Sequence, residues 1–204
     1  MLEAINLVGV RGERRLFNRL SFQVRAGECL LVQGENGSGK TTLLRMLAGL
    51  TASAEGAILW KGRLLDEQLG EYQRDMLYCG HGLGLKEDLS TMENLLISAA
   101  LAGISTTPAL VSDALKEVGL AGRESLSVRG LSQGQKRRAG LARLLLQQSS
   151  LWILDEPLTA LDTAGCQWLV NVIDRHLLDG GLVVLTSHQH LSLAGTSHSI
   201  RMGA

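Results

Sequence analysis

The stretch that decides the fold is the octapeptide Gly34-Glu35-Asn36-Gly37-Ser38-Gly39-Lys40-Thr41. It matches the phosphate-binding pattern Gly-x-x-x-x-Gly-Lys-Ser/Thr, and it stands between an apolar run at residues 29–32 and a helical pattern that starts at Thr42. At such a strand-to-helix turn, glycines let backbone N–H groups close around phosphate oxygens, and the helix N-terminus adds partial positive charge. The context disfavours the alternative, a glycine-rich turn that binds nothing.

Two side chains of this stretch carry the chemistry expected of a nucleotide site. Lys40 can reach the β- and γ-phosphates, and Thr41 supplies a hydroxyl for Mg²⁺, which prefers hard oxygen ligands. We expect the whole octapeptide and Thr42 behind it to contact the phosphates. The implied ligands are ATP and Mg²⁺.

The composition limits the class of protein. Lysine plus arginine and aspartate plus glutamate both number 20, so no net charge favours a nucleic-acid partner. Cys29, Cys79 and Cys166 are widely spaced and predict buried thiols rather than a zinc site or a disulfide framework. No signal peptide is evident, and the longest mostly apolar stretch, residues 95–104, is about half of the ~20 residues that a spanning helix needs. We expect no direct membrane insertion, so a membrane role would come through a separate subunit.

Short apolar runs alternate with helical patterns along the chain. We expect strands at residues 2–8, 21–24, 28–33, 57–60, 63–65, 76–79, 151–154 and, as the last, 182–185. Helices are expected to begin at Thr42 and after Ser90, Thr107, Ser132 and Asp162, the last of them spanning about 163–178. This order predicts an α/β fold with a mainly parallel core sheet and an antiparallel β portion. Residues 1–82 and 149–204 would form the catalytic core lobe, and residues 83–148 a helical subdomain.

Polar groups follow the predicted parallel strands at their carboxyl ends, where ligand groups gather in such sheets. Asp155 comes directly after the apolar residues 151–154 and predicts a carboxylate that holds Mg²⁺ opposite Lys40. The next residue, Glu156, can polarise a water for attack on the γ-phosphate. His188 could hydrogen-bond that phosphate and the attacking water. A solvated Asp-Glu pair is the alternative, which the upstream phosphate loop disfavours, and a lone His188 would more often be a surface residue.

A second motif, Leu131-Ser132-Gln133-Gly134-Gln135, opens a later helix. Ser132 stands at the N-cap position, and Lys136, Arg137 and Arg138 follow in the first turn, where their charges oppose the helix dipole. An anion bound there would offset this cost. The alternative is a solvated basic turn.

With these motifs the chain resembles the ATP-binding-cassette (ABC) ATPases, whose signature Leu-Ser-Gly-Gly-Gln is matched except at Gln133. The resemblance covers essentially all 204 residues and implies a P-loop ABC cassette that pairs head to tail with a second copy. Ser132 and Gly134 of one copy would then meet the γ-phosphate held by Lys40 of the other, and Gln135 would belong to the same half of the site. It also implies that Ala160-Leu161-Asp162 contacts the second copy, that His188 is the switch histidine and that the helical insert faces a transmembrane partner.

Two positions depart from the general family pattern. His81 stands where the family usually has a glutamine that touches Mg²⁺ and water, so we expect it at the metal. Arg11 stands where an aromatic residue usually stacks on adenine, and a guanidinium can also stack on a base.

The segments 76–95 and 151–162 resemble one subfamily, the ATPase subunits of the cytochrome c maturation system. This resemblance implies ATP hydrolysis that powers haem export or the release of a haem-loaded chaperone. It implies transmembrane subunits resembling CcmB, with CcmC and CcmD, and a peripheral location at the cytoplasmic face of the inner membrane. The alternatives are an ABC ATPase for another small-molecule substrate, or a soluble cassette acting on DNA or ribosomes, for which the basic stripe, coiled-coil arms and second cassette are missing.

Overall fold

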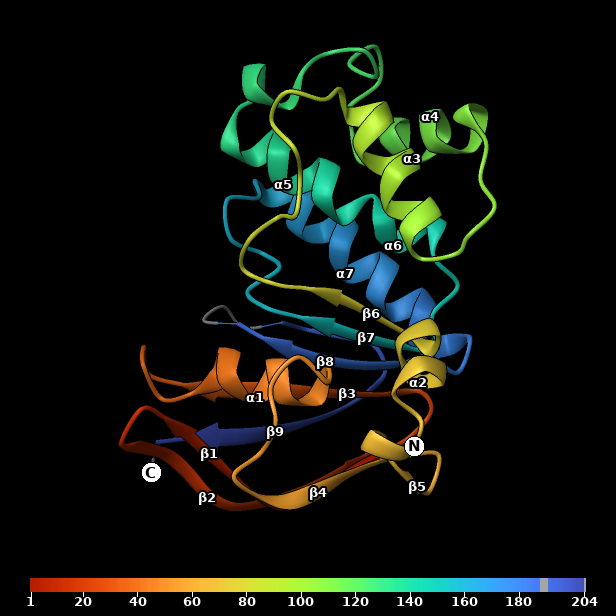
Figure 1. Ribbon diagram of the computed structural model, residues 1–204. Helices are drawn as coiled ribbons and strands as arrows, with labels where there is room; N and C mark the ends of the chain where they lie inside the picture. The colour runs from red at the N-terminus through yellow and green to blue at the C-terminus, as the bar shows by residue number, and fades with distance from the viewer. Residues whose placement is uncertain (188–190, 204) are drawn as a thin grey trace. The chain divides into compact units, whose positions relative to one another are not determined.

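The computed structural model describes residues 1–187 and 191–203, and its contacts divide the chain into two compact units (Figure 1). The first, here called the sheet unit, contains Met1–His81, Ser149–Pro157 and Ile173–Ala204. The second, the helical unit, contains Gly82–Gln148 and Leu158–Val172. The contacts thus group residues 158–172 with the helices, whereas the sequence assigned them to the core lobe.

The sheet unit holds all of the strands among the described residues. Its strands are β1 (Leu2–Arg11), β2 (Arg14–Val24), β3 (Glu28–Gly34), β4 (Glu55–Trp60), β5 (Arg63–Leu64), β6 (Met76–Cys79), β7 (Leu151–Leu154), β8 (Leu182–Thr186) and β9 (Thr196–Met202). It also contains α1 (Lys40–Leu47), the short 3-10 helix η1 (Leu65–Glu67), α2 (Leu69–Asp75) and the C-terminal part of α7 (Thr163–Leu178).

Two sheets form from these strands. One has the order β2-β1-β4-β5 with antiparallel pairs, and the other the order β6-β7-β8-β3-β9 with parallel pairs. The predicted parallel core sheet with an antiparallel portion is therefore confirmed. Because parallel strands end at one edge, the residues after β3, β6, β7 and β8 gather there.

One apolar core joins both sheets to α1, which lies between them in Figure 1. Leu43, Leu44 and Leu47 of α1 are fully buried in it, together with Leu30 of β3 and Ile153 of β7. Burying each such side chain contributes about 2 kcal/mol relative to leaving it exposed. The start of α1, and with it the phosphate loop, is thereby fixed against the parallel sheet.

Three of the differences from the sequence-based expectation concern the elements of the sheet unit. β2 begins at Arg14 rather than near residue 21, because pairs such as Gly9↔Phe17 and Val10↔Arg15 with β1 hold its polar first half. α2 was not predicted, and it is anchored through the buried Tyr72. β8 is not the last strand, since β9 pairs with β3 at the edge of the parallel sheet.

The helical unit contains α3 (Thr91–Leu101), α4 (Pro108–Glu117), the 3-10 helix η2 (Val128–Gly130), α5 (Gln133–Leu141), α6 (Arg143–Leu146) and the start of α7 (Thr163–Leu178). The predicted caps are present. Ser90 and Glu93 form a capping box, and Thr107 caps α4 ahead of Pro108. In the described part of the chain, no helix has the length and apolarity to cross a membrane.

Candidate nucleotide site

The phosphate loop connects β3 to α1 within the sheet unit. Lys40 is the first residue of α1 and is only 8% exposed. Its Nζ donates hydrogen bonds to the carbonyl oxygens of Gly34 and Glu35, at 2.8 and 3.1 Å. The ammonium group is therefore held across the loop by acceptors of the loop itself. Phosphate oxygens can replace these carbonyl groups as acceptors, because an ammonium group has three donors that rotate freely.

The loop backbone leaves no room for side chains at two of its glycines. Gly39 has a φ of 100°, and a Cβ there would lie 2.9 Å from Leu16 Cβ. Gly34 has a φ of 151°, and a Cβ there would lie 2.7 Å from the Met202 carbonyl oxygen. Ser38 Oγ is buried and has no hydrogen-bond partner among the described residues. A buried hydroxyl without a partner beside a glycine cradle fits a phosphate oxygen.

Asp155 lies at the centre of the site, one residue beyond β7, and is 1% exposed. Its Oδ2 accepts a hydrogen bond of 2.8 Å from Thr41 Oγ1, and its Oδ1 accepts one of 2.8 Å from Thr186 Oγ1. Its backbone N–H donates to the Cys79 carbonyl oxygen at 2.8 Å. The fold thus places the predicted Mg²⁺ carboxylate beside the predicted Mg²⁺ hydroxyl. One carboxylate and one hydroxyl are the hard oxygen ligands that Mg²⁺ prefers.

Glu156 follows with an unusual backbone conformation. Its φ is 50°, in the left-handed region, and its N–H donates a hydrogen bond of 2.8 Å to Thr186 Oγ1. Thr186 therefore contacts both acidic residues of the site. This residue was not singled out from the sequence. Parallel pairing of Leu154 with Leu185 supplies the missing signal, because it brings the next residues of β7 and β8 together.

Tyr78 of β6 is a second residue that the sequence reasoning passed over. Burial raises the pKa of its phenol, and the negative charge of Asp155 raises it further, against an opposing effect of Arg45. The phenol is thus kept neutral near the acidic centre of the site.

Two further predicted residues, both within the described part of the chain, form no hydrogen bond or ion pair with the phosphate loop or Asp155. His81 is exposed two residues after β6, and Arg11 is exposed at the end of β1, opposite Arg14. No group of three histidine, cysteine, aspartate or glutamate side chains that could hold a metal occurs in residues 1–187 and 191–203. His188 lies outside the described residues.

The signature motif belongs to the helical unit. Ser132 caps α5, accepting a hydrogen bond from the Gln135 N–H at 3.3 Å, while its own N–H donates to Gln135 Oε1 at 3.0 Å. Gly134 has no space for a side chain, since a Cβ would lie 2.9 Å from the Ala160 carbonyl oxygen. The motif and the predicted dimer-contacting loop are therefore packed together inside one unit.

The basic turn behind the motif finds its counter-charges in the same unit. Lys136 Nζ lies 2.8 Å from Glu87 Oε1. Arg138 pairs with Asp162 and donates to the Val118 carbonyl oxygen at 3.0 Å. The Lys136 ammonium group lowers the pKa of Glu87, and the Gly165 N–H and Arg138 lower the pKa of Asp162. Carboxylates of the chain thus offset two of the three charges of the basic turn, and the expected anion at this helix start stays a prediction.

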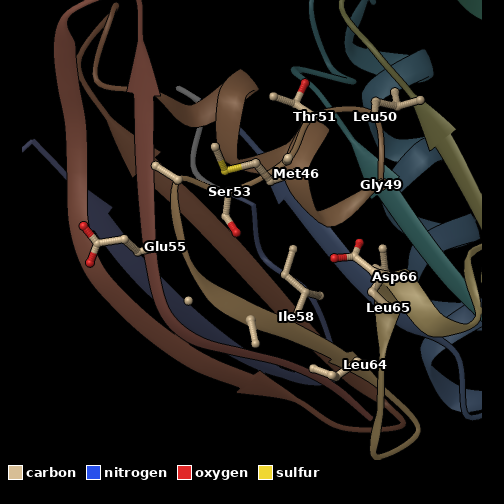
Figure 2. A pocket seen from close by; sticks show the side chains of 14 residues that line it. Met46, Gly49, Leu50, Thr51, Ser53, Glu55, Ile58, Leu64, Leu65 and Asp66 are labelled. Carbon is tan, nitrogen blue, oxygen red and sulfur yellow. The ribbon is translucent and has the colours of Figure 1, made fainter.

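A separate pocket of about 530 Å³ lies in the sheet unit, between the C-terminal end of α1 and the β4–β5 hairpin (Figure 2). Met46, Leu50, Ile58, Leu64 and Asp66 are among its lining residues. No residue of the octapeptide lines it. We therefore do not count it as part of the nucleotide site.

Comparisons with known proteins agree with these features. Residues 17–159 match the family described as ABC transporter. The chain is 61% identical to the cytochrome c biogenesis ATP-binding export protein CcmA of Pseudomonas aeruginosa, with both chains covered completely. It is also 61% identical to CcmA 1 of Cupriavidus metallidurans, covering 100% of this chain and 98% of that one. A solved ATP-binding subunit of an ABC transporter superposes with a TM-score of 0.82 at 28% identity, covering 92% of this chain and 79% of that chain.

These matches confirm the resemblance found in the sequence and the fold that it implied. The chain belongs to the ABC transporter family as an ATP-hydrolysing subunit, and within that family to the cytochrome c biogenesis ATP-binding export proteins.

Proposed function

We propose that this chain hydrolyses ATP with Mg²⁺ at the carboxyl edge of its parallel sheet. Lys40 and the amides of residues 34–42 bind the phosphates, Glu156 activates the attacking water and His188 aligns it. The observation that supports this most is the hydrogen bond from Thr41 to Asp155, which joins residues 114 positions apart in the sequence. It places a phosphate-loop hydroxyl on the carboxylate that the sequence assigns to the metal.

Thr41 and Asp155 would hold Mg²⁺, and we propose that His81 contributes from the end of β6. When bound, Mg²⁺ neutralises charge on the β- and γ-phosphates. The role of the protein is to hold the two acidic residues in place. Asp155 is buried and fixed through both carboxylate oxygens, so it can offer an oxygen in a set direction. Glu156 is held next to it through its backbone N–H. Arg11 would stack on the adenine.

We further propose that the site is completed by a second copy of the chain, which supplies Ser132, Gly134 and Gln135. The internal capping and ion pairs of this segment support the proposal, because they leave it a rigid surface that needs no ligand of its own to fold. Isolated chains should then hydrolyse ATP poorly when dilute. Specific activity should rise with protein concentration, and a value that stays constant for a monomer would contradict the second copy.

The transported or released compound is proposed to be haem or a haem-loaded chaperone. Support comes from the sequence resemblance and from the relatives, which are named as export proteins of cytochrome c biogenesis. The helical unit would face transmembrane subunits resembling CcmB, with CcmC and CcmD, and hold the chain at the cytoplasmic face of the inner membrane. Reconstituted vesicles assayed for ATP-dependent haem movement and for chaperone release separate the two outcomes. Membrane binding that persists after deletion of these subunits would contradict the partners.

The hydrolytic role is tested by Glu156→Gln, which keeps the shape of the side chain and removes the carboxylate. We expect ATP binding to persist and turnover to fall on the order of 10²–10⁴-fold, the usual contribution of a general base. Glu117→Gln, at an exposed glutamate of α4, is the matched control and should behave as wild type. Wild-type turnover in Glu156→Gln would refute the assignment.

A further inference from the structure

We infer that Thr186 is the positioning residue of this site, because one hydroxyl sets both Asp155 and Glu156. The inference rests on the proposed function, in which these two residues hold the metal and activate water. Thr186 itself would touch neither substrate nor metal. Its role would be to fix the two acidic residues relative to each other.

The Thr186 side chain is completely buried, at 0% exposure. A hydroxyl has one proton to donate and lone pairs that accept. Thr186 Oγ1 donates that proton to Asp155 Oδ1 at 2.8 Å and accepts from the Glu156 N–H at 2.8 Å. The hydroxyl proton thus goes to the Asp155 carboxylate, and the hydroxyl oxygen accepts the proton of the Glu156 backbone N–H.

The bond to Asp155 sets the orientation of the carboxylate toward the phosphate loop. With Oδ1 held by Thr186, Oδ2 is the oxygen that meets Thr41 at the start of α1. Rotation of the carboxylate would break both hydrogen bonds. Hydrogen bonds to charged groups are the stronger ones, so the orientation is well defined before any ligand arrives.

The bond to Glu156 supports a backbone conformation that is unfavourable for this residue. A φ of 50° is strained in a residue other than glycine, and it persists only where surrounding contacts hold it. Thr186 can supply that contact because its own backbone is fixed in the sheet, where it pairs with Val32 of β3. A β-branched side chain also has restricted χ1 rotation, which keeps the hydroxyl in place.

The decisive experiment compares variants that differ only in the hydroxyl. Thr186→Val keeps the branched shape and removes the hydroxyl, while Thr186→Ser keeps the hydroxyl. We would measure binding of ADP by calorimetry with and without Mg²⁺, the Mg²⁺ concentration for half-maximal ATP hydrolysis, and the melting temperature. Thr186→Val should lose roughly 10-fold or more of the Mg²⁺-dependent gain in ADP affinity, in line with loss of a hydrogen bond to a charged group. Thr186→Ser should retain most of it.

Thr91→Val is the matched control. Thr91 is also at 0% exposure, and its hydroxyl proton is shared between the carbonyl oxygens of Arg123 and Glu124, but it lies in the helical unit. The Thr91→Val variant should have a lower melting temperature and an unchanged Mg²⁺ dependence. A Thr186→Val variant that shows the same pattern as Thr91→Val would overturn the inference.

If Thr186→Val does not fold, Thr186→Ala and Thr186→Ser carry the same comparison, since they differ by the hydroxyl alone. Equal Mg²⁺ dependence in these two would also overturn the inference. The proposed function fails separately, through wild-type turnover in Glu156→Gln. Loss of turnover in Glu156→Gln together with wild-type Mg²⁺ dependence in Thr186→Val would leave the function standing and remove only the role of Thr186.

Discussion

Two regions of the molecule differ in how their polar groups are bonded. We call residues 34–41, 155, 156 and 186 the nucleotide corner, and residues 132–138 the signature segment. In the corner, hydroxyl and ammonium groups bond to acceptors that a nucleotide and a metal could replace, and Ser38 Oγ has no partner in the described chain. In the signature segment, a capping box and ion pairs satisfy the helix start from within. In the proposed function, the corner recognises ATP by itself, whereas the signature segment acts on ATP held by another copy.

The largest expected effect comes from Lys40→Ala, which tests whether the corner alone recognises ATP. Loss of a charge-assisted contact to phosphate, about 2–3 kcal/mol, should weaken ATP binding by on the order of 10²-fold, and turnover should fall with it. Binding of a fluorescent ATP analogue to the isolated chain measures this. Lys116→Ala, at an exposed lysine of α4, is the control. If Lys40→Ala binds ATP as tightly as wild type does, the nucleotide corner is not the part of the chain that recognises ATP.

The second effect concerns Gly134→Ala in the signature segment. The added Cβ would lie 2.9 Å from the Ala160 carbonyl oxygen, so the segment must shift. We expect turnover to fall about 10-fold or more, as for small misplacements of catalytic groups, while ATP binding to the isolated chain stays unchanged. Gly130→Ala, where a Cβ meets nothing within 4 Å, is the matched control. Weakened ATP binding in Gly134→Ala would show that the signature segment contributes within its own chain.

The smallest effect is a pH dependence of the sheet unit's stability. His176 stacks on Trp152 with ring centroids 3.7 Å apart, and burial lowers the pKa of His176 to about 4. The unfolded chain binds this proton near pH 6.5, so the stabilisation is complete above pH 6.5 and is lost as pH falls towards 4. Partial exposure limits the loss to about 1 kcal/mol at pH 5.

Urea unfolding at pH 7.5 and pH 5 measures this loss. His176→Phe keeps an aromatic ring against Trp152 and should flatten the pH dependence. His198→Gln, at an exposed histidine 3.7 Å from Glu28, is the control variant. Equal pH dependence in wild type and His176→Phe would show that His176 does not set it.

Local signals made most of the chain predictable. The sequence predicted the capping box at Ser90, the start of α4 at Thr107-Pro108 and the bounds of α7, because each of them depends on neighbouring residues. The elements that were missed depend on distant partners. β9 reads as polar and exposed, and it is a strand only because β3 pairs with it. Tertiary pairing overrides weak local preference in such segments.

The same distinction applies to the site. The phosphate loop and the Asp155-Glu156 pair follow motifs, and the structure brings Thr41 to Asp155 as expected. Thr186 and the Lys136–Glu87 pair could not be read from motifs, because their partners lie 31 and 49 residues away. Only the register of β7 against β8 and the packing of the helical unit reveal them.

The most direct test of the account mixes two inactive variants, Lys40→Ala and Gly134→Asp, and measures ATP hydrolysis. Each protein alone should be inactive, because one lacks the nucleotide corner and the other carries a bulky negative group in the signature segment. Mixed chains can pair so that one site joins an intact corner to an intact signature segment. We predict that the mixture regains measurable hydrolysis. A mixture that stays as inactive as its components, although sedimentation shows that the chains associate, would contradict a site shared between two copies.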